Sequence, residues 1–278
     1  MKIKNEIIEL EVIEKGGEIQ SLLFDNKEVM WQGDPNHWTG KNPTLFPLVG
    51  NTYSKDYQID GKTYAMKNHG LIRYYDLKCV KCDDDEIIME LKESKDSLSK
   101  YPFKFTYQIK YSLDNNKVNI DYFIRNDSEK DMPFTFGLHP GFNVDNFEES
   151  YLEYEKKEKA KQIVFNEGVV YEKDVTLDKW PLSYEEIMKY QTIVYKGLKS
   201  KYFKLVLKDY TIKLNAEDYP YFAIWTSDDK APFICLEPWH GHADFQENNV
   251  DFKDREGMMS LKPGEIFKTG YSIELIKE

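Results

Sequence analysis

Residues 103–124 read FKFTYQIKYSLDNNKVNIDYFI, and they carry the clearest structural signal in the chain. Apolar or aromatic side chains occupy every second position from 103 to 113, and the alternation resumes from 118 to 124. Between the two runs stands Asp114-Asn115-Asn116, a combination that favours tight turns. Because a period of two is typical of a strand with one buried face, this stretch predicts an antiparallel β-hairpin.

The same alternation recurs along the chain, in runs separated by short polar turns. It is present around residues 89–91, 203–207, 212–214 and 271–275. Aromatic residues make up 15% of the sequence, and they suit pleated surfaces with one buried side. Long helical patterns between the strands are missing, which argues against a doubly wound α/β fold. We therefore expect an all-β fold in a single domain over residues 1–278.

One segment departs from this pattern. Residues 148–200 alternate poorly and include a lysine-rich stretch from Lys156 to Lys161. We interpret the segment as a solvated loop, with a mobile wall of a binding cleft as the alternative. Within it, Ser183-Tyr184-Glu185-Glu186 fits a capping box, so one short helix is expected to begin there.

Composition narrows the range of partners. The formal net charge is −11, and the arginines are Arg73, Arg125 and Arg255. An acidic, arginine-poor surface repels phosphate backbones, so we expect no nucleic-acid partner. No apolar run approaches the ~20 residues that a membrane helix needs, and no signal peptide precedes the first strand. These features predict a cytoplasmic protein with no membrane partner.

The cysteines are few and odd in number: Cys79, Cys82 and Cys235. Cys79 and Cys82 have the CxxC spacing that occurs in redox and zinc sites, but no second CxxC accompanies them. The pair also lies in strand-like sequence and not at a helix start. We therefore expect free thiols in a reducing compartment.

Candidate functional residues gather where glycine or proline marks strand ends. His69, His139, and the pair His240 and His242 all lie in such places, where binding residues concentrate. Each histidine taken alone is more often a structural hydrogen-bonding residue. Glu237 ends the apolar run 233–236, so burial is expected to raise its pKa and to suit it to general-base chemistry. Large aromatics are usually core residues, but some could supply flat faces for sugar rings, and the candidates are Trp31, Trp38, Trp225 and Trp239.

A metal site is an alternative for the last of these clusters. His240-x-His242, followed by Glu247, resembles part of the cupin metal motif, because alternate histidines on a strand can share an ion with a carboxylate. The glycine spacing of that motif is absent, and the stretch has the composition of a loop. We therefore expect no metal here.

Several motifs, in order along the chain, resemble those of the aldose 1-epimerase family, in a less characterised branch near the galactose mutarotases. Asn68 to Arg73 resembles the His-Gly-Phe-Ala-Arg element of that branch, and Phe136 to Asn143 resembles its His-Pro-x-Phe-Asn element. The other matching stretches are Gly16 to Leu22, Trp31 to Pro35 with Trp38, Leu45 to Gly50, Glu217 to Pro220 with Trp225 and Thr226, and Ile234 to Glu237.

The resemblance implies a large antiparallel two-sheet supersandwich. It also implies a cofactor-free isomerase that interconverts the α and β anomers of a hexose, with Glu237 as general base and His139 as general acid. His69 and Asp218 would bind sugar hydroxyls. A homodimer is one possible assembly of the protein. The further substrate-binding candidates are Asn51, Arg73, Trp225 and Trp239.

Two departures from the branch leave other functions open. Asn51 stands where the branch usually has arginine, and Glu237-Pro238-Trp239 replaces the Glu-Thr-Gln of galactose mutarotases. Asparagine can still hydrogen-bond a hydroxyl, but it lacks the charge and the fork of arginine. A hexose-6-phosphate mutarotase and a non-catalytic sugar-binding or sensing protein of the same fold are therefore the alternatives.

Overall fold

The predicted hairpin is present, and its two strands are neighbours in the largest sheet of the protein. The computed structural model describes residues 1–166, 169–247 and 249–277. Strands β10 (Phe105–Asp114) and β11 (Lys117–Asn126) are antiparallel, and Asp114 pairs with Lys117 across the turn. The alternate side chains of both strands are buried, as the sequence predicts.

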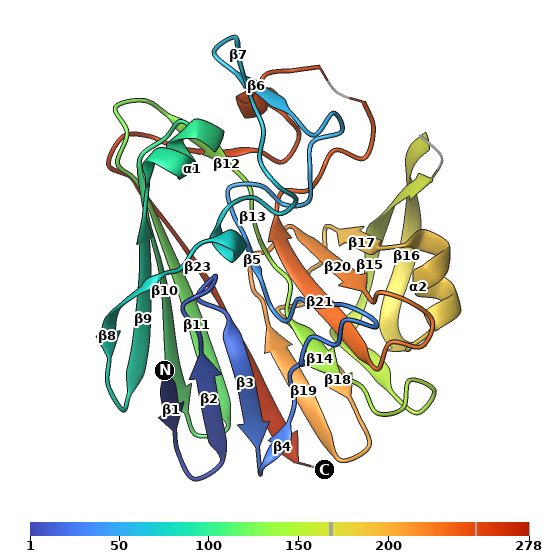
Figure 1. The fold of residues 1–278 in the computed structure, drawn as a ribbon. Helices are drawn as coiled ribbons and strands as arrows, with labels where there is room; N and C mark the ends of the chain where they lie inside the picture. Colours follow the sequence, from blue (N-terminus) through green and yellow to red (C-terminus); the bar gives the residue numbers. More distant parts are fainter. Residues whose placement is uncertain (167–168, 248, 278) are drawn as a thin grey trace.

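Most strands belong to one continuous sheet of 15 strands, which curls through the whole molecule (Figure 1). Its order is β5-β13-β21-β20-β17-β15-β18-β19-β23-β11-β10-β9-β8, while β14 pairs with β21 and β16 with β15. Every strand pairing in this sheet is antiparallel. The remaining strands of this sheet are β5 (Thr44–Leu45), β8 (Lys78–Cys82), β9 (Glu86–Lys92), β13 (Phe136–Leu138), β14 (Gly141–Asn143), β15 (Tyr151–Asn166), β16 (Val169–Pro181), β17 (Ile193–Lys196), β18 (Tyr202–Val206), β19 (Tyr210–Asn215), β20 (Tyr221–Trp225), β21 (Phe233–His240) and β23 (Ile266–Lys277).

A smaller sheet closes the sandwich. It has four strands, of which the first two lie in front of β10 and β11 in Figure 1: β1 (Lys2–Lys4), β2 (Ile8–Val12), β3 (Ile19–Phe24) and β4 (Lys27–Glu28). Buried side chains of both sheets form one hydrophobic core, and the Tyr111 hydroxyl crosses it to donate to the Gly17 carbonyl at 2.6 Å. The antiparallel two-sheet fold expected from the sequence is thus confirmed.

Short elements complete the chain. Two small two-stranded sheets pair β6 (Tyr57–Ile59) with β7 (Lys62–Tyr64) and β12 (Met132–Phe134) with β22 (Met259–Leu261). The helical elements are η1 (Ile72–Tyr74), α1 (Lys95–Lys100), α2 (Tyr184–Tyr190) and η2 (Phe252–Asp254). Among the residues that the structure describes, none of these helices has the length and apolar character needed to cross a bilayer.

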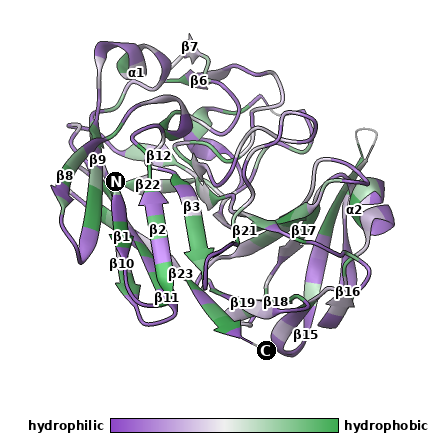
Figure 2. Ribbon diagram, turned by 60° about the horizontal axis from the view of Figure 1, so that its bottom comes forward, coloured by the Kyte–Doolittle hydropathy of each residue, from purple (hydrophilic) through white to green (hydrophobic). Residues whose placement is uncertain are grey.

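The interpretation of residues 148–200 as a solvated loop is wrong. Strands β15 and β16 form a long hairpin there, and its outer strand is largely exposed and hydrophilic (Figure 2). The pairing register shifts between Glu153 and Glu158, and β15 pairs with β18 before that irregularity and with β17 after it. This change of partner interrupts the alternation, which is why the sequence pattern is weak. The short helix is confirmed as α2, because the Ser183 side chain accepts from the Glu186 N–H.

The expectation of free thiols at Cys79 and Cys82 is also wrong, since the structure joins them in a disulfide. In a regular strand, side chains three residues apart point to opposite faces. The register of β8 against β9 slips between Cys79 and Lys81, so Val80 is an extra residue. Such a bulge reverses the alternation, and both sulfurs consequently lie on the same side of this edge strand. Cys235 is a free, buried thiol.

Candidate active site

Glu237 lies in the middle of β21, where every residue from 233 to 239 is buried. Only 1% of its surface is exposed. The Glu237 side chain projects from the same face of the strand as its second neighbours Cys235 and Trp239, because strand side chains alternate. The apolar run that the sequence shows before Glu237 is therefore a buried central strand, and the carboxyl group is part of its inner surface.

His139 is held opposite Glu237 by two short strands, β13 and β14, which both pair with the same side of β21. The register is given by the pairs Gly137–Trp239 and Gly141–Cys235. His139 lies midway between these two pairs, in the link from β13 to β14, and is 7% exposed. Its Nε2 is 3.4 Å from Oε1 of Glu237. Side chains separated by nearly a hundred residues thus meet because of strand register.

Burial pushes both groups of this pair toward their neutral forms. It raises the pKa of Glu237 well above its ordinary value, and the indole N–H of Trp239 offsets only part of this rise. Burial also lowers the pKa of His139 well below its ordinary value, aided by the nearby His69 and by the charge of Arg73. Two buried atoms of the pair, Nδ1 of His139 and Oε2 of Glu237, have no hydrogen-bond partner among the described residues. Both atoms therefore keep hydrogen-bonding capacity that a bound molecule can use.

His69 presents a hydrogen-bond donor to the same space. The Gly50 N–H donates to Nδ1 of His69 at 3.1 Å, so the proton of the neutral ring is on Nε2. Burial, followed by the charge of Arg73, lowers the pKa of His69 to about 3. The ring is therefore uncharged near neutrality. Its centroid lies 5.5 Å from that of His139.

Tryptophans enclose His139 on two sides. The Trp38 ring stacks on the imidazole with centroids 4.7 Å apart, and Trp225 contacts it edge-on at 5.3 Å. Trp31 is buried behind them, and its indole N–H donates to the Trp38 carbonyl at 2.8 Å. Of the four candidate sugar platforms, Trp38, Trp225 and Trp239 border the cavity and Trp31 is a core residue.

These side chains surround one cavity of about 520 Å³, within the size range of small-molecule sites. Besides Trp38, the structure brings together there seven of the residues expected from the sequence: Asn51, His69, Arg73, His139, Trp225, Glu237 and Trp239. The other lining residues are Gly50, Tyr53, Asn68, Phe165, Thr192, Val194, Ala243, Asp244 and Phe245.

Asp218 is not part of this cavity, contrary to its predicted role as a ligand of sugar hydroxyls. It lies in the turn before β20 and borders a different cavity, beside Lys201 and Glu217. Trp225 stands at the other end of β20, and a strand of that length spans about 17 Å. Glu237 itself pairs with Ala223 in the middle of β20, and the turn that contains Asp218 borders the other cavity.

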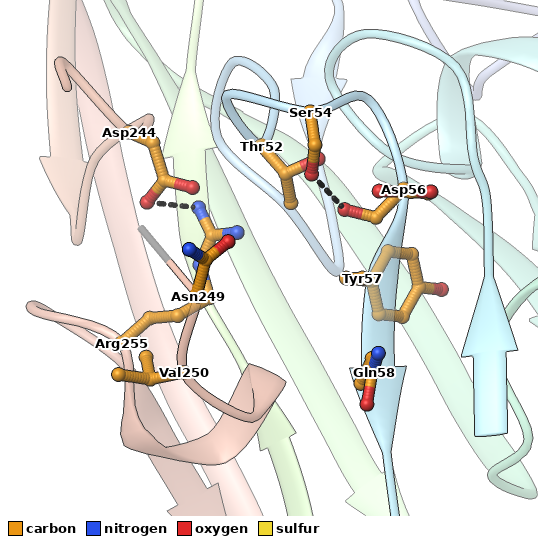
Figure 3. A pocket seen from close by; sticks show the side chains of 9 residues that line it. All are labelled: Thr52, Ser54, Asp56, Tyr57, Gln58, Asp244, Asn249, Val250 and Arg255. Carbon is orange, nitrogen blue, oxygen red and sulfur yellow. Dashed lines mark hydrogen bonds and ion pairs between the residues drawn. The ribbon is translucent and has the colours of Figure 1, made fainter. Parts of the chain in front are cut away.

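Asp244 supplies a carboxylate that the sequence reading missed. It follows β21 and accepts from the Tyr53 N–H at 3.1 Å, and its own N–H donates to the Asn51 carbonyl. A buried ion pair of 2.7 Å joins Asp244 to Arg255. Asp244 also borders a neighbouring polar cavity of about 350 Å³, which Figure 3 shows with Thr52 and Arg255. A single aspartate in a loop carries no periodic signal that could have revealed this position.

Another wall of the cavity comes from residues 148–200, the segment interpreted as a solvated loop. Phe165 of β15 and Thr192 and Val194 around β17 line the cavity. The alternative interpretation, in which this segment is a wall of the binding cleft, therefore places it correctly. Phe165 stacks on Phe245 with ring centroids 4.5 Å apart, which ties this hairpin to the loop after β21.

The cupin-like metal cluster does not form. Nε2 of His240 lies 3.3 Å from the Thr269 hydroxyl, and Nδ1 of His242 lies 2.7 Å from the Ala243 carbonyl oxygen. Within the described part of the chain, His240, His242 and Glu247 do not converge as a group of ligands.

The fold and the site together define a class: a large antiparallel β-sandwich with a buried acid–base pair in an aromatic cavity. The sequence profile of the aldose 1-epimerase family matches residues 1–274. The chain belongs to the aldose 1-epimerase family.

The similarity to known proteins extends over nearly the whole chain. Chromosomal Protein LacX of Lactococcus lactis subsp. lactis is 24% identical, with 99% of each chain covered. A galactose mutarotase related enzyme from Lactobacillus acidophilus is 28% identical, with 99% and 96% coverage and a TM-score of 0.93. A galactose mutarotase-like protein from Lactobacillus casei ATCC 334 is also 28% identical, with 99% of both chains covered and a TM-score of 0.90.

The loop that carries His69 depends on Gly70. Gly70 has φ +80°, and an added Cβ would lie 2.3 Å from the Phe46 carbonyl oxygen. We expect Gly70→Ala to lower the free energy of unfolding by about 2–4 kcal/mol, because strain and overpacking combine. Gly61 is the matched control, since its φ is +74° but nothing lies near an added Cβ. Urea denaturation of both variants tests this, and equal losses of stability would contradict it.

Proposed function

We propose that this protein catalyses the interconversion of the α and β anomers of an unphosphorylated hexose. The observation that carries the proposal is the buried pair itself, with Nε2 of His139 at 3.4 Å from Oε1 of Glu237 at the base of the cavity. Such a pair can take a proton from one oxygen of a bound pyranose and give one to another. The family to which the chain belongs supports this reaction class.

The reaction moves one proton between two oxygens of the sugar. Glu237 removes the proton from the anomeric hydroxyl, and the electrons of that O–H bond form the carbonyl. The C1–O5 bond breaks, its electron pair stays on O5, and His139 protonates that oxygen. Rotation about C1–C2 turns the aldehyde, and ring closure reverses the two roles. The sum of these steps changes only the configuration at C1.

The pair therefore needs one proton at any moment. Burial favours the form in which Glu237 carries the proton and His139 is neutral. The reactive form has the same number of protons, with a carboxylate and an imidazolium. Transfer across the 3.4 Å gap interconverts the two forms without changing the net charge. Sugar hydroxyls that hydrogen-bond the carboxylate would favour the ionic form.

Other side chains are suited to hold the sugar. Nε2–H of His69 can donate to a ring or hydroxyl oxygen. The side-chain oxygen of Asn51 accepts from the Thr52 N–H, so its amide nitrogen is the group available to the substrate. Trp225 and Trp239 offer flat apolar faces to sugar C–H groups.

Glu237→Gln tests the role of the carboxyl group. We expect kcat to fall by at least about 100-fold, because an amide neither accepts nor returns the proton. Asp218→Asn is the matched control: it makes the same change in the turn before β20 and should leave kcat unchanged. Polarimetry of freshly dissolved anomers gives both rates, and unfolding curves check that both variants are folded. A Glu237→Gln variant as active as the unmodified protein would refute the assignment.

The pH dependence of kcat tests the proton count. The pair holds one proton between the lowered pKa of His139 and the raised pKa of Glu237. We expect a flat rate across neutral pH, because coupled groups lose their protons in two separate steps. The rate falls on the acid side only well below the ordinary pKa of histidine, where His139 becomes protonated, and on the alkaline side only well above the ordinary pKa of glutamate, where Glu237 loses its proton. An acid limb centred on the ordinary histidine value would contradict this account.

The cavity favours a neutral sugar over a sugar phosphate. Arg73 is the only arginine or lysine among the described side chains that line it, and Asp244 adds a negative charge. Phosphate sites usually have several cations. We therefore expect kcat/KM to be higher for a hexose than for its 6-phosphate, measured with matched anomers. Faster turnover of the phosphate would favour a hexose-phosphate mutarotase, and binding by calorimetry without turnover would favour a non-catalytic sugar-binding protein.

A further inference from the structure

A third side chain joins the acid–base pair. Cys235 is the second neighbour of Glu237 on β21 and is fully buried. The ligand atoms of Cys235, His139 and Glu237 all lie within 4.8 Å of one another, a grouping that no other three metal-ligating residues make in the described ranges. The proposed proton transfers use His139 and Glu237 but leave the thiol without a role.

Strand register explains why the thiol faces the pair. Cys235 and Glu237 project from the same face of β21, since side chains alternate along a strand. The residue paired with Cys235 on the β14 side is Gly141, so β14 places no side chain beside the sulfur. The backbone of three strands therefore fixes all three groups, which makes this a rigid arrangement and not a chance approach of surface side chains.

The separation of the nitrogen and oxygen ligands suits a tetrahedral metal ion. Zinc bonds of about 2.1 Å to nitrogen and oxygen place these atoms about 3.4 Å apart at the tetrahedral angle. Nε2 of His139 and Oε1 of Glu237 are 3.4 Å apart. The sulfur completes a thiolate–imidazole–carboxylate set, which prefers zinc and similar thiophilic ions to magnesium or calcium. His139 and Glu237 line the cavity, so an ion has a route from solvent.

We infer that Cys235, His139 and Glu237 form a binding site for Zn²⁺ and related thiophilic divalent ions, and that occupancy of this site blocks the acid–base pair. Coordination displaces the protons of the thiol and the carboxyl group to solvent. The bound ion occupies the electron pairs that would otherwise accept protons from the sugar. The inhibitory part of this inference rests on the proposed function, whereas ion binding does not.

The experiment uses Co²⁺ as a spectroscopic probe of the thiolate and Zn²⁺ as the inhibitor. The background carries Cys79→Ser and Cys82→Ser, which removes the exposed cysteine pair as a source of signal. We expect the background protein to show thiolate-to-cobalt charge-transfer absorption that Zn²⁺ abolishes by displacing the cobalt. Adding Cys235→Ser should remove this absorption, and Cys235→Ala is the second variant if serine perturbs folding.

Inhibition is measured on the same proteins. Loss of even an outer partner of a metal ligand typically weakens binding 10- to 100-fold. We therefore expect Cys235→Ser to raise the Zn²⁺ concentration for half-inhibition by at least about 10-fold, with kcat in the absence of metal preserved. Mg²⁺ should not inhibit either protein.

Two results would overturn the inference: no charge-transfer absorption in the background protein, or absorption that persists without Cys235. Zn²⁺ inhibition that is unchanged by the loss of Cys235 would overturn the inhibitory part. If the protein has no epimerase activity at all, the proposed function fails, and the cobalt absorption and its loss in Cys235→Ser still decide the metal site.

Discussion

The pairing of β13 and β14 along one side of β21 is the constraint on which the site depends. It places His139 directly opposite Glu237, and the surrounding sheet removes both from solvent. Desolvation opposes charge on either group. The fold therefore holds a buried imidazole and a buried carboxyl group at a separation slightly longer than a hydrogen bond.

The rest of the cavity is added to this pair by segments from distant parts of the chain. The loop before Gly50 and the loop that carries His69 are joined by the hydrogen bond from the Gly50 N–H to Nδ1 of His69. The β15–β16 hairpin contributes Phe165 to the lining. The same arrangement that isolates the pair also brings Cys235 beside it. The site proposed to move protons is thereby also a candidate site for a soft metal ion.

Sequence patterns predicted the fold where one face of a strand is buried, as in β10 and β11. They failed at irregular strands: the register shift in β15 and the extra residue at Val80 both break the period of two. The resemblance to the family located Glu237, His139 and His69, because their motifs are local. It misplaced Asp218, and it could not find Asp244, because a loop aspartate has no periodic context and its position depends on the tertiary contacts with Asn51 and Tyr53.

A crystal structure of the protein with a bound hexose tests the central claim most directly. We expect a pyranose in the cavity beside Trp38 and Trp225, with the anomeric oxygen about 2.6–3.2 Å from Glu237 and the ring oxygen at a similar distance from His139. A sugar that binds elsewhere, for instance in the cavity beside Arg255, or that turns its anomeric carbon away from Glu237, would contradict it.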